Sequence, residues 1–278
     1  MFKFIRGCVG LFAVCFVLAG CSDEPGRVGA SNVNKSQDVE AIKRAAEQGD
    51  AEAQFDLGAR YANSHGVAKD EAEAVKWYQK AAEQGHAKAQ FNLSAMYHYG
   101  LGVAKDEAEA VKWLQKAAEQ GNAKAQLDIS EMFFKGQGIA KDEVEAAKWL
   151  QKAAERGFAP AQHNLGGMYG SGRGVTKDEA EAVKWTQKAA EQGYAVAQYT
   201  LGWAYANGRG VAKDDAEAVK WWRKAAEQGN AKAQHNLGVM YFYGRVVAKD
   251  ETEARKWFQK AADQGYEDAK KALEAMKK

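Results

Sequence analysis

Cysteine is scarce in this chain. Only three occur among the 278 residues, at Cys8, Cys15 and Cys21, and every later position lacks it. The body of the chain therefore has no disulfide, although small secreted domains usually need such bridges. A chain of this length can be stabilised by a large apolar core instead, and we expect that core to provide the stability here.

Net charge is scarce as well, because 39 basic residues stand against 37 acidic ones. Proteins that bind nucleic acid carry a basic patch or stripe that meets the phosphate backbone. An evenly mixed, nearly neutral chain lacks that signature, so we expect no nucleic-acid partner. The lysines and glutamates are interpreted as solvent-exposed faces.

Catalytic and metal-binding motifs are missing from the sequence too. Neither Ser-x-x-Lys nor Lys-Thr-Gly, the motifs of penicillin-binding enzymes, occurs in it. Residues 170–174, GSGRG, lack the Gly-Lys-Ser/Thr ending of a phosphate-binding loop. The histidines show no metal-ligand spacing; they are His65, His86, His98, His163 and His235. We therefore predict no enzyme activity, no metal and no cofactor.

Long hydrophobic stretches are absent from the sequence. The apolar run at residues 8–18 is shorter than the ~20 residues that cross a bilayer. Lys3 and Arg6 precede this run and small residues follow it, an order that is typical of a secretory signal peptide. We predict that residues 1–20 are a signal peptide and that the polar residues 21–33 are a flexible tether.

The sequence Leu18-Ala19-Gly20-Cys21 resembles the bacterial lipobox. The resemblance implies cleavage before Cys21, a lipid on its sulfur, and an acyl chain such as palmitate on the new amino terminus. Ser22, in place of an aspartate, implies transport to the outer membrane of a Gram-negative cell, with the protein facing the periplasm. The alternative is an ordinary signal peptide with a free Cys21.

What the chain does contain is a strict repeat. The phrase Ala-Ala-[Glu/Asp]-[Gln/Arg]-Gly occurs seven times at intervals of 36 residues, with its glycine at Gly49, Gly85, Gly121, Gly157, Gly193, Gly229 and Gly265. A period of this length is the signature of a solenoid in which each repeat is a helical hairpin that stacks on its neighbours. The sequence predicts an all-α fold over residues 34–278, with six full repeats of antiparallel helix pairs between two capping helices.

Each hairpin marks its own helix ends. In the first, Asp50 can cap a helix from Ala51 to about Asn63, and Asp70 begins an Asp-x-x-Glu capping box for the second helix. The same pair recurs as Asp106/Glu109, Asp142/Glu145, Asp178/Glu181, Asp214/Glu217 and Asp250/Glu253. We interpret these carboxylates as helix starts, because an acid–base pair in every repeat would not define one active site.

The first helix of most hairpins carries a glycine, which helix propensity disfavours by about 1 kcal/mol. The slot holds Gly58, Ser94, Ser130, Gly166, Gly202 and Gly238. We expect a close approach of the second helix to compensate, with the repeated tryptophans Trp77, Trp113, Trp149, Trp185, Trp221 and Trp257 packing nearby as core. In the sixth loop Val246 replaces a glycine, and we expect a different backbone there, because a β-branched residue is strained at positive φ.

A longer pattern contains these features: A-x-A-Q-x-x-L-G-x-x-Y, then G-x-G-V-x-x-D-x-x-x-A-x-x-W, then A-A-E-Q-G. Over residues 34–278 it resembles the Sel-one-like repeat, a relative of the tetratricopeptide repeat. The resemblance implies a right-handed superhelical solenoid that acts as an adaptor or scaffold, and bacterial members are often periplasmic or lipid-anchored. Cysteine-rich members linked to penicillin binding have a disulfide in each repeat, which this chain lacks.

By resemblance to tetratricopeptide arrays, the first helices line a concave groove. The slots expected to be exposed there hold aromatic residues where free surface is usually polar, which is typical of a binding site. We predict that a protein or peptide partner binds to this groove at Phe55, Phe91, Phe134, Tyr199, Trp203 and Phe242. The alternative is that these rings close the inner packing of a tight superhelix.

The leading hypothesis is a lipid-anchored adaptor or scaffold of the cell envelope, monomeric and without catalysis. The alternative is an immunity protein that neutralises a secreted toxin such as a lipase. A hydrolase acting on peptidoglycan or β-lactams is disfavoured, because no pair of nucleophile and base is found.

Overall fold

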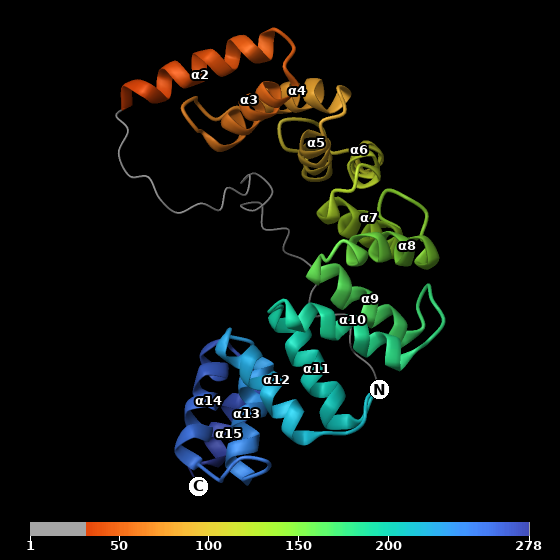
Figure 1. Cartoon of the computed structure of the whole chain (residues 1–278). Helices are drawn as coiled ribbons and strands as arrows, with labels where there is room; N and C mark the ends of the chain where they lie inside the picture. The colour runs from red at the N-terminus through yellow and green to blue at the C-terminus, as the bar shows by residue number, and fades with distance from the viewer. Residues whose placement is uncertain (1–31, 278) are drawn as a thin grey trace. The chain divides into compact units, whose positions relative to one another are not determined.

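The computed structural model describes residues 32–277, and within that range it contains fourteen α-helices and no strand (Figure 1). The all-α architecture and the number of helices that the repeat predicts are confirmed. The signal segment at residues 1–20, the lipidation site Cys21 and most of the tether lie outside the described residues.

The helices follow one another with short connections. The first, α2 (Asn32–Glu47), begins two residues before the predicted start at Asn34. Twelve helices of 13 residues and the shorter α15 follow it. They are α3 (Ala51–Asn63), α4 (Glu71–Glu83), α5 (Ala87–Tyr99), α6 (Glu107–Glu119), α7 (Ala123–Lys135), α8 (Glu143–Glu155), α9 (Ala159–Ser171), α10 (Glu179–Glu191), α11 (Ala195–Asn207), α12 (Asp215–Glu227), α13 (Ala231–Tyr243), α14 (Glu251–Asp263) and α15 (Glu267–Ala275).

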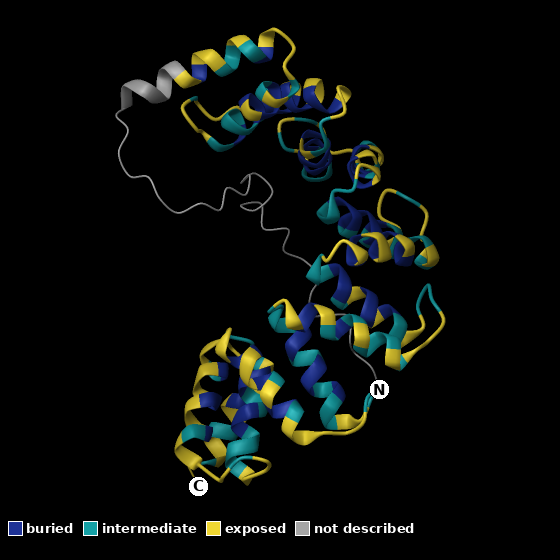
Figure 2. Ribbon diagram, in the orientation of Figure 1, coloured by how far each residue is buried: buried dark blue, intermediate teal, exposed yellow. Residues whose placement is uncertain are grey.

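Two compact units make up the chain, and the division falls between Lys141 and Asp142. In the first unit, α2 packs on α3, and each helix from α3 to α6 packs on the next. In the second unit, the same holds from α8 to α15. Within each unit the buried residues lie where neighbouring helices meet, and the loops are mostly exposed (Figure 2).

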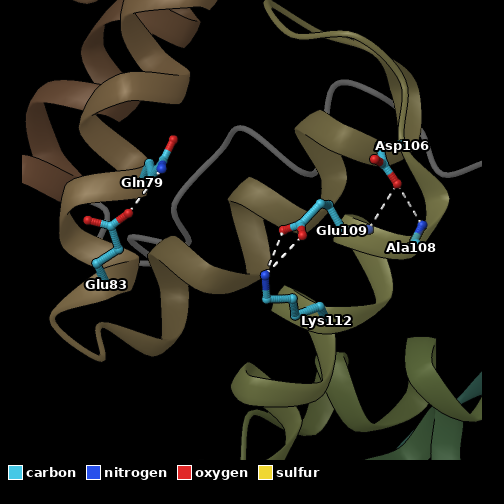
Figure 3. A network of polar contacts seen from close by, with 6 residues as sticks. All are labelled: Gln79, Glu83, Asp106, Ala108, Glu109 and Lys112. Atoms are coloured by element: carbon cyan, nitrogen blue, oxygen red, sulfur yellow. Dashed lines mark hydrogen bonds and ion pairs between the residues drawn. The ribbon is translucent and has the colours of Figure 1, made fainter.

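An aspartate caps the second helix of each hairpin, as Asp106 illustrates. Its carboxylate accepts hydrogen bonds from the backbone N–H groups of Ala108 and Glu109, at 2.9 and 3.0 Å (Figure 3). The reciprocal half of the predicted capping box does not form. Glu109 accepts from Lys112 at 2.9 Å instead, and the Asp106 N–H donates to the Tyr97 carbonyl at 3.0 Å. The aspartate cap is confirmed, whereas the box is wrong, because the end of the first helix takes the N–H that the box would use.

The glycine slot confirms the predicted close approach of the second helix, but a different side chain makes it. A Cβ at Gly202 would lie 2.6 Å from Cδ1 of Trp222, and one at Gly58 would lie 2.8 Å from Cδ1 of Tyr78. Both rings belong to the residue after the repeated tryptophan. Consecutive helical residues point about 100° apart, so the two positions face different neighbours.

The sixth loop does not have the different backbone that we expected. Val246 has a φ of 66°, close to the 68° of Gly210 in the preceding loop. The two loops also share a hydrogen bond. The Asp250 N–H donates to the Tyr241 carbonyl at 3.0 Å, as the Asp214 N–H does to the Tyr205 carbonyl in the preceding loop. The expectation was wrong: the shared hydrogen bonding imposes the left-handed conformation, and Val246 bears the strain.

Replacing Val246 with glycine should raise the free energy of unfolding by about 1 kcal/mol. A non-glycine residue in the left-handed region is strained by about 1–3 kcal/mol, and the greater entropy of an unfolded glycine offsets part of that. Val246 is 51% exposed, so little packing is lost. Urea unfolding measures the change. The matched control is Val247→Gly, which removes a half-buried side chain from the core and should destabilise the protein. A Val246→Gly variant no more stable than the parent would contradict the strain.

Candidate functional site

The repeated tryptophans lie in the core of the helix stack. Four of them are buried and two are half-buried; the buried ones are Trp77, Trp113, Trp149 and Trp257. The Nζ of the lysine three residues later lies over each of the six rings, 3.9 to 4.5 Å from its centroid. For the four buried rings, the interpretation as core is confirmed.

Two of the predicted partner-binding residues are not exposed. Phe55 on α3 and Phe91 on α5 are each 8% exposed. Phe55 stacks on the His86 ring, with centroids 4.7 Å apart, and Phe91 lies beneath the Nζ of Lys124 at 5.1 Å. The expected exposure of this slot is wrong for both residues, because His86 at the start of α5 covers Phe55 and Lys124 on α7 covers Phe91. They close the inner packing, which was the alternative interpretation.

Phe134 and Phe242 are half-buried and lie in different units. Phe134 is near the end of α7. Phe242 on α13 packs against a core cluster that includes Phe258, and its ring meets that of Tyr243 edge-on at 5.0 Å. Tyr243 is 61% exposed, so this pair adds an apolar edge to the second unit.

Tyr199 and Trp203 lie one helical turn apart on α11, and both are half-buried. The guanidinium of Arg209 lies 5.8 Å from the centroid of the Trp203 ring. Arg209 is itself held by Glu179, to which it donates hydrogen bonds of 3.1 and 2.6 Å. Burial raises the pKa of the Tyr199 hydroxyl, and the Tyr199 carbonyl accepts from Nε1 of Trp222 at 3.2 Å. The Tyr199–Trp203 pair therefore has one contact to Arg209 through the Trp203 ring and one to Trp222 through the Tyr199 backbone.

A buried carboxylate in the first unit escaped the sequence analysis. Asp128 on α7 is only 8% exposed, and burial raises its pKa to about 7. It lines a small cavity of about 40 Å³ together with residues of α5 and α6. A signal was present in the sequence: Asp128 occupies a slot that holds asparagine in three other repeats, at Asn92, Asn164 and Asn236.

The described part of the chain has neither a metal-binding cluster nor a membrane-spanning helix. Among residues 32–277, no group of three or more histidine, cysteine or acidic side chains is placed to hold a metal ion. In the same range, no helix combines the length and the apolar character that crossing a bilayer requires.

The Sel1 repeat family matches the chain at residues 51–86, 87–122, 123–158, 159–194, 195–230 and 231–266. A protective antigen of uropathogenic Escherichia coli strains with an SLR fold is 41% identical, with a TM-score of 0.82 over 86% of this chain and 51% of that one. The chain thus spans about half the length of that antigen. A Sel1 repeat protein from Oxalobacter formigenes is 36% identical, with a TM-score of 0.69 over 84% of this chain and 97% of that one.

A more distant match is an immunity protein from Pseudomonas aeruginosa. It is 28% identical, with a TM-score of 0.49 over 79% of this chain and 81% of that one. No curated protein matches the chain.

Proposed function

The chain belongs to the Sel1 repeat family, and from that premise we propose that it is a lipid-anchored scaffold of the bacterial envelope. In this proposal it binds a protein or peptide partner, catalyses no reaction, and faces the periplasm from the outer membrane. Stacked helical hairpins support such a role, because they present extended surfaces built from the variable positions of each repeat.

The single observation that carries the proposal is the Tyr199–Trp203 pair on α11. Trp203 stands outside the repeated tryptophan slot, so the packing that explains the other rings does not explain it. Tryptophan and tyrosine dominate the energetic centres of protein interfaces. Arg209 and Glu179 hold the Trp203 ring in place, and an anchor that is already ordered loses less entropy on binding.

Site-specific crosslinking in cells tests this surface. A photoreactive phenylalanine analogue at position 203 should capture one partner from the envelope fraction. The same analogue at Lys220, an exposed position on α12, is the matched control and should not capture it. Equal capture at both positions, or none at 203, would place the partner site elsewhere.

The anchor is tested at Cys21. Because the lipid is attached through the cysteine sulfur, Cys21→Ala should abolish palmitate labelling and leave a precursor that keeps residues 1–20. Cys15→Ala leaves the lipobox intact and should be processed and labelled normally. Mass spectrometry of the two variants measures the outcome. A Cys21→Ala variant that still fractionates with the membrane at the mature mass would refute the anchor.

A further inference from the structure

The cavity around Asp128 lies among α5, α6 and α7 of the first unit. Its apolar walls include Phe91, Leu114 and Met132. Two polar residues also line it, of which Glu131 is half-buried and Gln137 is exposed. A water molecule needs roughly 10–15 Å³ of such space. A volume of about 40 Å³ therefore has room for the end of one side chain, such as a CH₂–NH₃⁺ group.

The second hairpin lacks a ring at a position where the first, fifth and sixth hairpins have Tyr78, Trp222 and Phe258. In the sixth hairpin, Phe258 fills the space against Gly238, where an added Cβ would lie 2.7 Å from the ring. The second hairpin has Ser94 and Leu114 in these two slots. Leucine is shorter than phenylalanine, and both Ser94 and Leu114 line the space that is left.

Asp128 is the carboxylate of this cavity that has no ion pair among residues 32–277. No hydrogen bond reaches its side chain in that range either, and Lys124, whose charge acts on it, lies over the Phe91 ring. Glu131, by contrast, is paired with Lys135. A buried carboxylate without a partner is costly, and a cation placed beside it would recover much of that cost.

Aromatic side chains add a second feature that favours a cation. Tyr99 lines the cavity, and burial together with the nearby carboxylates of Asp128, Glu131 and Glu107 raises its pKa to about 12. Phe91 lines it as well. Aromatic faces attract ammonium groups, and combinations of rings with a carboxylate suit alkylammonium ligands.

We propose that this cavity binds an alkylammonium group, with Asp128 as its counter-ion and Phe91 and Tyr99 as aromatic walls. Leu114 and Met132 contact the methylene group next to the nitrogen. The group comes either from a lysine side chain of a bound protein or from a free amine. This proposal rests on the residues that line the cavity and is independent of the proposed partner surface at Tyr199 and Trp203.

Titration of the full mature chain with n-butylammonium chloride, followed by NMR, tests the proposal. We expect saturable binding with a roughly millimolar dissociation constant, and binding of n-butanol, the neutral analogue, that is at least about tenfold weaker. The blocked amino acid Nα-acetyl-lysine N-methylamide distinguishes the sources: it binds at least as well if the site takes a lysine side chain, and it fails to bind if the site takes only a free amine.

Three variants give the test its controls. Asp128→Asn, which keeps the shape, should weaken n-butylammonium binding by about tenfold or more. The double variant Ser94→Gly/Leu114→Phe copies the sixth hairpin and should block the cavity. Asp56→Asn changes the equivalent but exposed residue of the first hairpin and should leave binding unchanged. Circular dichroism confirms that each variant is folded.

The dependence of binding on pH gives an independent readout. Because burial raises the pKa of Asp128 to about 7, cation binding displaces a proton and should tighten between about pH 6 and pH 8. The other titratable groups that line the site are His98 and Tyr99 on α5 and Glu131 on α7. Lys124 on α7 acts on Asp128, and Glu107 on α6 acts on Tyr99, from beside the cavity. Loss of the pH dependence in Asp128→Asn assigns it to Asp128. The proposal would be overturned if n-butylammonium does not bind, or if it binds no more tightly than n-butanol does. It would also be overturned if n-butylammonium binds to Asp128→Asn as tightly as to the parent protein.

Discussion

Replacing Asp128 with asparagine should raise the free energy of unfolding by up to about 4 kcal/mol at pH 8. The reason is burial, which raises the pKa of this carboxyl from its ordinary 3.8 to about 7. The rise in pKa corresponds to about 4 kcal/mol at most, since a tenfold change in the acid dissociation constant is worth 1.36 kcal/mol and the buried asparagine amide keeps a burial cost of its own. Asparagine is accepted at the equivalent buried position Asn92, so the variant should keep the fold. Urea unfolding of both proteins measures the difference.

The sign of the pH dependence follows from the same shift. Between about pH 4 and pH 7 the folded state holds the Asp128 proton and the unfolded state has released it, so stability falls as the pH rises through this window. The gain from Asp128→Asn should therefore be small near pH 4 and reach its full size above pH 7. Asp56→Asn at the exposed equivalent position should show neither effect. A gain that is the same at pH 4 and pH 8 would mean that the charge of Asp128 is not its source.

Replacing Trp222 with alanine should lower the free energy of unfolding by about 3–5 kcal/mol. Trp222 is 4% exposed, belongs to the core cluster of α12 and α13, and packs against the backbone at Gly202. Deleting so large a buried side chain loses its transfer free energy and leaves a cavity that neighbours fill only in part. The hydrogen bond from its Nε1 to the Tyr199 carbonyl is lost as well.

The neighbouring residue supplies the control for this prediction. Trp221 precedes Trp222 on the same helix but is half-buried, with the Nζ of Lys224 4.2 Å from its ring centroid. Trp221→Ala should therefore cost less than Trp222→Ala in thermal or urea unfolding. Equal losses would contradict the conclusion that the residue after the repeated tryptophan is the one that packs against the glycine slot.

The helices could be predicted because their signals are local and recur. Gly49 and Asp50 lie side by side in the sequence, and together they end one helix and cap the next, as the Asp50 carboxylate does for the Ala53 N–H at 2.7 Å. Because the same phrase recurs every 36 residues, it also predicts that each hairpin packs on the next in the same way. Helix α3 accordingly runs over the predicted Ala51–Asn63.

The contacts between repeats were harder to predict, because they depend on which direction a side chain points. A shift of one position separates Trp77 from Tyr78, and only the structure shows that the Tyr78 ring meets Gly58. In the same way, Phe55 occupies a slot that a tetratricopeptide groove would expose, yet the ring of His86 covers it. At Val246 the hydrogen bonds of the loop impose a positive φ, although a β-branched residue prefers a negative one.

The Asp128 cavity could not be predicted from the sequence, although one signal pointed to Asp128. Its slot holds asparagine at Asn92, Asn164 and Asn236, but Asp56 in the same slot is exposed, so the slot alone does not show that Asp128 is buried. Asp128 on α7 lines the cavity with residues of α5 and with Leu114 on α6. A site of this kind becomes visible only when three helices are placed together.

The most direct test of the proposed function is the affinity of the purified protein for the partner captured at position 203, measured for the parent and for Trp203→Ala. The account predicts a loss of about 2 kcal/mol or more, which is roughly 30-fold in the dissociation constant, with unchanged helical circular dichroism. Lys220→Ala, on the exposed face of α12, should bind as the parent does. An unchanged dissociation constant in a folded Trp203→Ala variant would contradict the claim that the Tyr199–Trp203 pair is the partner surface.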